Sequence, residues 1–167
     1  MIPPVLYNAL LRRHTSRRRI VQPRDVGAPF SGRVVYIPDG DGFSVSLGNR
    51  LVSVRLYGID APERGQAFFT QSRYFLAGQI WSKPVKCFPM ATDKYNRLIC
   101  DCYGLSRYPL SLLSVLYGYS WHYSYFAPDD NALRDAQRLA RTFRRGLWHT
   151  KYQVAPWVFR LGKKNRK

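Results

Sequence analysis

The sequence predicts an α+β fold, a small five-stranded β-barrel with three helices, and three features of the chain predict it. Five short runs alternate between apolar and polar residues, and turn-forming residues bound each run. One helical segment lies between the third and fourth runs, and two more follow the fifth. The hydrophobic fraction of 46% and the aromatic fraction of 15% are enough to fill a core in a chain of 167 residues.

The first three strands are expected to form a meander. Residues 32–37, GRVVYI, and 43–47, FSVSL, are predicted strands on either side of DGDG, and Asp-Gly between two such runs is a strong hairpin signal. Gly-Asn at 48–49 marks a second hairpin turn, into the strand RLVSVRLYG at 50–58. Alternation along this third strand places its apolar side chains on one face and Arg55 on the other.

The remaining elements follow in order along the chain. We predict a helix at 67–80, strands at 83–88 and 97–103, and a helix at 109–119 that ends near Gly118. The last helix begins where Asp129 and Asp130 can cap its N-terminus and ends before Gly146. Five short strands with a helix inserted after the third predict a partly closed Greek-key barrel of the oligonucleotide-binding type.

The charge of the chain indicates its partner. Lysine and arginine outnumber acidic residues by 27 to 10, which gives a net charge of +17. A charge of this size usually reflects a polyanionic partner, and nucleic acid, DNA or RNA, is the commonest one. We expect a monomeric nucleic-acid-binding domain at 29–160, between a basic arm at 1–28 and a basic tail at 161–167. No apolar run is long enough to span a bilayer.

The N-terminal arm and the cysteines bear on the location of the protein in the cell. The arm is arginine-rich and has no acidic residue before Asp25, which is typical of a mitochondrial presequence. An arm that binds nucleic acid accounts for the same composition. Cys87, Cys100 and Cys102 match no metal or redox spacing, which favours reduced thiols in an intracellular protein.

Carboxylates are few in the middle of the chain, so their positions are informative. Asp41 follows the first strand, and VRLYGIDAPE places Asp60 and Glu63 just beyond the end of the third. In a three-stranded meander Asp41 and Asp60 lie at adjacent strand ends, so we expect them to converge. Two carboxylates with a main-chain carbonyl and waters suit a hard cation such as Ca²⁺.

Two arginines and a glutamate complete the predicted site. A guanidinium can hold two oxygens of a phosphodiester at once, so Arg55, and Arg97 in DKYNR, are candidate phosphate ligands. Glu63 is close enough to Asp60 in sequence to accept a proton from an attacking water, or to orient it. The set predicts a metal-dependent phosphodiesterase site on a basic barrel.

These motifs resemble those of the staphylococcal nuclease (thermonuclease) family. The resemblance rests on DGDGFSV, VRLYGIDAPE, DKYNR and the C-terminal GLW…APW, in family order, from about Ser31 to Phe159. It implies a five-stranded oligonucleotide-binding barrel with three helices. It also implies a Ca²⁺-dependent hydrolase of DNA and RNA, an endonuclease or exonuclease, that cleaves the 5′ P–O bond and leaves 3′-phosphate ends.

The resemblance also implies roles for single residues. Asp41 and Asp60 resemble the calcium carboxylates of the family, and the carbonyl of Ala61 resembles a further ligand. Glu63 resembles the residue proposed as general base.

Substrate-binding positions are implied in the same way. Arg55 and Arg97 resemble the phosphate-binding arginines, and Lys94 and Tyr95 resemble substrate-contacting positions beside the second arginine. Three aromatic residues further on form either a base-stacking surface or part of the core: Tyr123, Tyr125 and Phe126.

The sequence departs from the family motifs at two positions and in one loop. DGDT is DGDG here, so Gly42 lacks a hydroxyl near the metal, and we expect weaker ordering of the site. DKYGR is DKYNR; since asparagine tolerates left-handed backbone geometry, Asn96 is expected to leave Arg97 correctly aimed. The loop after Glu63 is short, which is expected to alter the access of substrate.

Two other functions remain open from the sequence. One is a catalytically weak or inactive nucleic-acid-binding module with the same barrel. The other is a structural protein of an organellar ribonucleoprotein, in which the basic ends carry the function.

Overall fold

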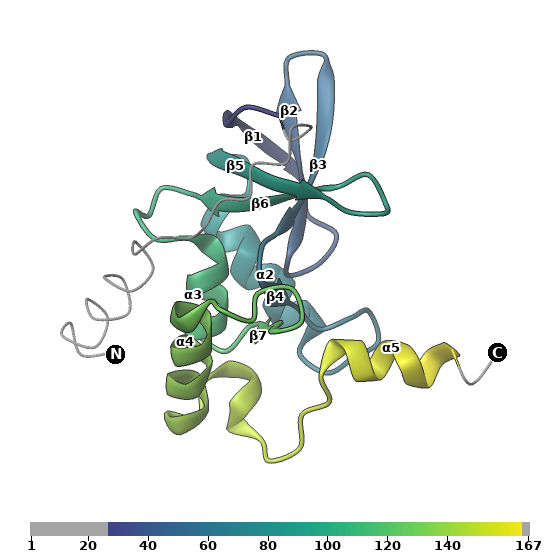
Figure 1. The fold of residues 1–167 in the computed structure, drawn as a ribbon, viewed down its shortest axis with the longest axis vertical. Coiled ribbons are helices and arrows are strands. Elements are labelled where there is room, and N and C mark those ends of the chain that lie inside the picture. The colour runs from purple at the N-terminus through teal and green to yellow at the C-terminus, as the bar shows by residue number, and fades with distance from the viewer. Residues whose placement is uncertain (1–26, 165–167) are drawn as a thin grey trace.

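The computed structural model describes residues 27–164, and Figure 1 shows the fold. Almost all of the basic arm, and with it the presequence hypothesis, lies outside the described residues. No helix within 27–164 is both long enough and apolar enough to cross a membrane.

Five strands close into the predicted barrel. Around the barrel they run in the order β1 (Phe30–Tyr36), β2 (Gly42–Leu47), β3 (Arg50–Leu56), β6 (Leu98–Tyr103) and β5 (Pro84–Thr92). The pairs are antiparallel except β3–β6, which is parallel, and β5 pairs with β1 to close the ring. The predicted five-stranded α+β fold is therefore confirmed.

Helices account for the main difference from the prediction. The three expected helices are present as α2 (Phe69–Ile80), α3 (Leu110–Leu116) and α4 (Asn131–Thr142). The carboxylate of Asp130 caps α4 by accepting the Leu133 N–H at 3.1 Å. A 3₁₀ turn, η1 (Gly146–His149), and a fourth α-helix, α5 (Pro156–Lys164), were not predicted. Figure 1 shows α3 and α4 packed together below the barrel, with α5 on the opposite side of the molecule.

A second, two-stranded sheet lies outside the barrel. It consists of β4 (Ile59–Asp60) and β7 (Trp121–His122), which pair antiparallel. Two residues are too few to show the alternation by which a strand is recognised in a sequence. This small sheet was therefore not predicted, although it carries Asp60.

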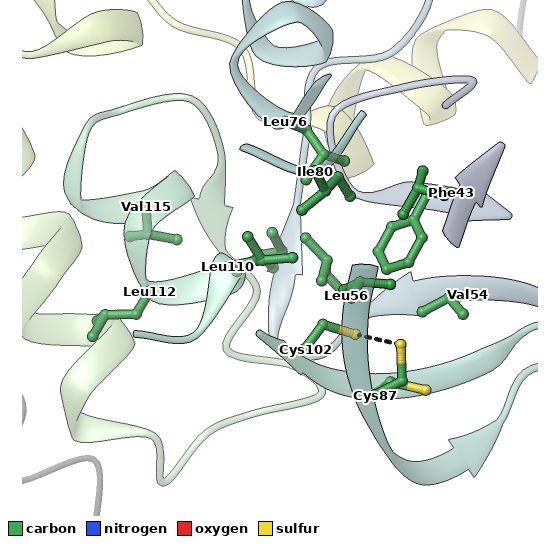
Figure 2. Close-up of a cluster of buried hydrophobic side chains, with 14 of the residues drawn as sticks. Phe43, Val54, Leu56, Leu76, Ile80, Cys87, Cys102, Leu110, Leu112 and Val115 are labelled. Atoms are coloured by element: carbon green, nitrogen blue, oxygen red, sulfur yellow. Dashed lines mark hydrogen bonds between the residues drawn. The ribbon is translucent and has the colours of Figure 1, made fainter. Parts of the chain in front are cut away.

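The core lies inside the barrel and continues between the barrel and the helices α2 and α3. Its largest fully buried side chains include Phe43, Leu56, Leu76, Ile80 and Leu110, shown in Figure 2. The three cysteines belong to this core and form no disulfide, and the Sγ atoms of Cys87 and Cys102 are 3.6 Å apart across β5 and β6. Burial raises the pKa of Cys102, which favours the thiol form.

Candidate active site

The DGDG turn between β1 and β2 is built around the carboxylate of Asp39. Its Oδ1 accepts the N–H of Asp41 at 3.2 Å and that of Gly42 at 2.7 Å. A Cβ added at Gly42 would lie 2.9 Å from this same Oδ1, so a side chain there would displace the carboxylate that orders the turn. Asp39 therefore orders the turn, and these hydrogen bonds do not involve the carboxylate of Asp41.

Asp41 and Asp60 converge on the guanidinium of Arg55. Arg55 lies opposite Gly42 in the β2–β3 ladder. It donates from Nη1 to Asp41 Oδ1 at 2.7 Å and from Nη2 to Asp60 Oδ1 at 2.8 Å. The predicted convergence of the two carboxylates is thus confirmed, and the planar guanidinium of Arg55 binds both of them.

Backbone pairing fixes the positions of these carboxylates. The carbonyl of Asp41 accepts the N–H of Leu56 at 2.8 Å, which ties the turn to β3. Asp60 lies opposite Trp121 in the β4–β7 sheet, and the N–H of Ala61 donates to Asp41 Oδ2. Both carboxylates are almost fully buried, with Asp41 2% and Asp60 0% exposed.

Burial disfavours the charged form of Asp41, and Arg55 only partly offsets this effect. Burial raises the pKa of Asp41 well above its usual range; the neighbouring carboxylates of Asp39 and Asp60 raise it further, against the opposing effect of Arg55. For Arg55, burial opposes the charged form, but the charges of Asp41 and Asp60 outweigh it and raise its pKa. A cation beside Asp41 would favour the ionised form of that carboxylate.

The donor set fits a hard cation that accepts carbonyl and water ligands. Within residues 27–164 no group of three or more histidine, cysteine or carboxylate side chains could hold a metal ion. Ca²⁺, however, binds main-chain carbonyls and waters as well as carboxylates. Asp41, Asp60 and the carbonyl of Ala61 together supply oxygen ligands only, so the residues present fit Ca²⁺ with water completing its coordination.

Glu63 reaches this cluster through a residue that the sequence did not reveal, Arg160 of α5. The Nη1 of Arg160 donates to Glu63 Oε1 at 2.6 Å and to Asp60 Oδ1 at 3.1 Å, and the Nη2 of Arg160 donates to Asp60 Oδ2 at 2.7 Å. The hydrogen bonds to Asp60 and Glu63 raise the pKa of Arg160 despite its partial burial. The sequence signal for α5 was the proline at its first position, followed by apolar side chains at helical spacing.

Arg97 lies near the cluster and is paired with another carboxylate. Arg55 is opposite Ile99 in the β3–β6 ladder, so Arg97, two residues earlier, is about 8 Å from Arg55 between Cα atoms. Its Nη2 lies 2.7 Å from Asp93 Oδ2. Asn96 has a φ of 60°, which confirms that asparagine accommodates the left-handed turn position before Arg97.

Lys94 and Tyr95 lie in the same turn as Arg97. The ring of Tyr95 is 69% exposed, and the Lys94 Nζ is 5.1 Å and the Arg97 Cζ 5.6 Å from its centroid. The turn thus combines an exposed aromatic ring with two cations, a suitable surface for a nucleotide.

The aromatic residues after β7 form an exposed cluster outside the core. Tyr125 and Phe126 are 78% and 62% exposed, and both contact Tyr123. The other neighbour of Tyr123 is Trp157 of α5, stacked on it at 4.9 Å between centroids and 17° between planes. Of the two alternatives from the sequence, the structure favours a surface for stacking over core packing.

Comparisons with known proteins identify a related family and related chains. Residues 53–150 match the family described as staphylococcal nuclease homologue, a span that includes Arg55, Asp60, Glu63 and Arg97. A micrococcal nuclease of Shigella flexneri is 34% identical over 147 residues, covering 83% of this chain and 84% of that protein. Protein ParB of Escherichia coli is 34% identical over 95% of each chain, and an uncharacterized endonuclease of Haemophilus influenzae is 33% identical over 79% of this chain and 74% of its own.

Proposed function

The chain belongs to the staphylococcal nuclease family, and we propose that it is a Ca²⁺-dependent nuclease that hydrolyses phosphodiester bonds of DNA or RNA. Cleavage of the 5′ P–O bond, leaving 3′-phosphate ends, completes the proposal. The relatives named as micrococcal nuclease and endonuclease support the reaction class. The net charge of +17 supports a nucleic-acid substrate.

One observation carries the proposal: three carboxylates, those of Asp41, Asp60 and Glu63, converge on two guanidiniums, those of Arg55 and Arg160. A purely structural ion pair needs one carboxylate for each guanidinium, but Asp41 and Asp60 share Arg55, and Glu63 lies beside Asp60. Glu63 is also the only glutamate in the sequence. Such an excess of buried negative charge is costly for stability, so it is expected where a cation and a reaction require it.

The residues of this chain would divide the work as follows. Asp41, Asp60 and the Ala61 carbonyl would hold Ca²⁺, which would supply positive charge next to the phosphate. Glu63 would accept a proton from the attacking water as the oxygen of that water bonds to phosphorus. The bond between phosphorus and the 5′ oxygen would then break, and the 5′ oxygen would take a proton from solvent water, so the products carry a 5′-hydroxyl and a 3′-phosphate.

Arg55 and Arg97 would stabilise the negative charge that develops on the phosphate. Arg55 pairs with Ile99 in the β3–β6 ladder and Arg97 directly precedes β6, so both arginines could contact one phosphate. Each now pairs with carboxylates, Arg55 with Asp41 and Asp60, and Arg97 with Asp93. These partners hold the two guanidiniums in place before a substrate arrives, which is the preorganisation that catalysis by charge requires.

The test is a cleavage assay on plasmid DNA and on single-stranded DNA and RNA, with Ca²⁺ or with EDTA. Wild type should cleave only with the metal, and its products should carry 3′-phosphate ends that a phosphatase removes. Glu63→Gln and Arg97→Ala should each lower the rate by at least about 100-fold, the usual contribution of a general base or of a charge-stabilising group.

Asp129→Asn is the matched control, because Asp129 is an exposed carboxylate in the loop before α4. It removes one negative charge, as Glu63→Gln does, and should leave the rate unchanged. Binding of a labelled oligonucleotide, followed by fluorescence anisotropy, shows whether each variant still recognises nucleic acid. Tight binding by wild type without cleavage under any divalent metal would overturn the nuclease and leave the binding module.

A further inference from the structure

The helix α5 and the segment before it contact the candidate site at three points, which recur every three residues. The carbonyl of Val154, just before α5, accepts a hydrogen bond from Gln66, whose own Oε1 accepts the N–H of Glu63. Trp157 stacks on Tyr123, and Arg160 donates to Asp60 and Glu63. Residues three apart in a helix lie on one face, so Trp157 and Arg160 point together towards the site.

Two other side chains of α5 are largely exposed. Val158 and Leu161 are 50% and 61% exposed, and in Figure 1 the helix lies to one side, joined to η1 by an irregular stretch at 150–155. Its inward face is thus directed at the very residues proposed to bind the metal, the attacking water and a base. A helix with only a structural role could have packed against any other part of the barrel surface.

Arg160 engages the oxygens that a divalent cation would use. Both oxygens of Asp60 accept from its guanidinium, at 3.1 and 2.7 Å, and Glu63 Oε1 accepts at 2.6 Å. Three carboxylates, Asp41, Asp60 and Glu63, here face two guanidiniums, those of Arg55 and Arg160. When Arg160 leaves, Asp60 and Glu63 lose a positive charge at hydrogen-bonding distance, so its departure strengthens the attraction for a cation.

We propose that α5 is an internal competitor of the nuclease site, in which Arg160 takes the place of the cation and Trp157 covers the ring of Tyr123 on which a base would stack. The inference rests on the proposed function, because it assigns regulation to the same site. Binding of Ca²⁺ at Asp60 displaces Arg160, and a base that stacks on Tyr123 displaces Trp157. Since both residues lie on one helix face, each displacement makes the other easier, so metal and substrate promote the binding of one another.

The test for Arg160 is the affinity of the full chain for Ca²⁺ alone, measured by isothermal titration calorimetry without nucleic acid. Arg160→Gln should lower the Kd for Ca²⁺ by about fivefold or more, the lower bound of typical coupling between sites. Arg160→Lys, which keeps the charge, should stay close to wild type. Arg138→Gln is the matched control, because it removes one positive charge from an exposed side chain of α4 and should leave the Kd unchanged.

Three outcomes separate the proposals. Tighter Ca²⁺ binding by Arg160→Gln alone supports the internal competitor. Equal or weaker binding, in a variant whose thermal unfolding in EDTA shows that it folds, overturns the internal competitor and leaves the nuclease standing. Failure of every variant to bind Ca²⁺, together with absence of cleavage, overturns the proposed function and the competitor with it.

Trp157 is tested without any metal. In EDTA, Trp157→Ala should bind a short single-stranded oligonucleotide about fivefold more tightly than wild type, because the exposed ring of Tyr123 is then free to stack. Trp81→Ala is a control, since Trp81 is a half-exposed tryptophan at the end of α2. Weaker binding by Trp157→Ala would show that Trp157 itself stacks with bases, and would overturn its role as a cover.

Discussion

Replacing Arg55 by methionine should destabilise the protein more than the loss of an exposed charge could. The side chain of Arg55 is 18% exposed, and it donates to two carboxylates and, at 3.2 Å, to the carbonyl of Ile59. Removing one partner of a buried ion pair costs about 3–5 kcal/mol, because the other partner is left buried without compensation. Asp60 keeps Arg160 as a partner, whereas Asp41 keeps only the Ala61 N–H, so we expect a loss at the lower end, about 3 kcal/mol.

The loss should depend on pH with a definite sign. The pKa of Asp41 is already raised by burial in the wild type, and without Arg55 it rises further. A carboxyl whose pKa is higher in the folded than in the unfolded state costs nothing at low pH, where both states are protonated. The cost grows as the pH rises above the unfolded pKa and becomes constant above the folded pKa. Arg55→Met should therefore be closer to wild type near pH 4 than near pH 8.

Guanidinium chloride unfolding in EDTA at several pH values measures both effects. Arg50→Met is the control, because Arg50 is exposed at the start of β3, and it should change stability by no more than about 0.5 kcal/mol. A loss of less than about 1 kcal/mol in Arg55→Met, or a loss that is the same at every pH, would refute the reasoning. The buried carboxylates would then be stabilised by something other than the guanidinium of Arg55.

Three further predictions concern the framework of the site. Asp93→Asn should destabilise the protein at pH 7 and match wild type at low pH. Although burial opposes ionisation, hydrogen bonds from Arg97 and Tyr95 lower the pKa of Asp93, so the stability that this carboxylate contributes is lost as the pH falls through the lowered pKa. Denaturant unfolding at pH 7 and at pH 2 measures the difference. Asn96→Ala should cost about 1 kcal/mol in denaturant unfolding and Asn96→Gly should cost nothing, because the φ of 60° suits glycine and penalises a Cβ. Asp130→Ala should cost about 1 kcal/mol through the lost cap of α4, seen as a lower midpoint with an unchanged m-value.

The parts of the site that the sequence predicted are those that local rules control. Two hairpin turns and the alternation along β3 were enough to place Arg55 on the outer face and to bring Asp41 and Asp60 to adjacent strand ends. Asn96 was expected to tolerate left-handed geometry because it replaces the glycine of the family motif DKYGR, and its φ is 60°. Each of these inferences concerns contacts between neighbouring strands or within a single turn. The periodicity and the turn residues of the sequence indicate such contacts.

Contacts between distant segments were beyond such rules. Arg160 and Asp60 are 100 residues apart, and no pattern in either segment indicates the other. The β4–β7 pair that carries Asp60 is too short to show alternation, and the parallel β3–β6 pairing that sets the distance between Arg55 and Arg97 depends on how the chain crosses over. The sequence thus predicted the three carboxylates and Arg55, whereas Arg160 and the contacts that join the cluster were found only in the tertiary fold.

The two guanidiniums of the cluster differ in how easily they can be replaced. Arg55 extends from a central barrel strand whose backbone is bonded on both sides, to β2 and to β6, so moving it would break the barrel. Arg160 extends from a helix near the end of the chain, its side chain is 39% exposed, and it can leave with that helix. A cation that binds Asp60 would therefore exchange with Arg160 and not with Arg55. On this reasoning the same carboxylates can have a permanent counter-ion that maintains the fold and a replaceable one that regulates the reaction.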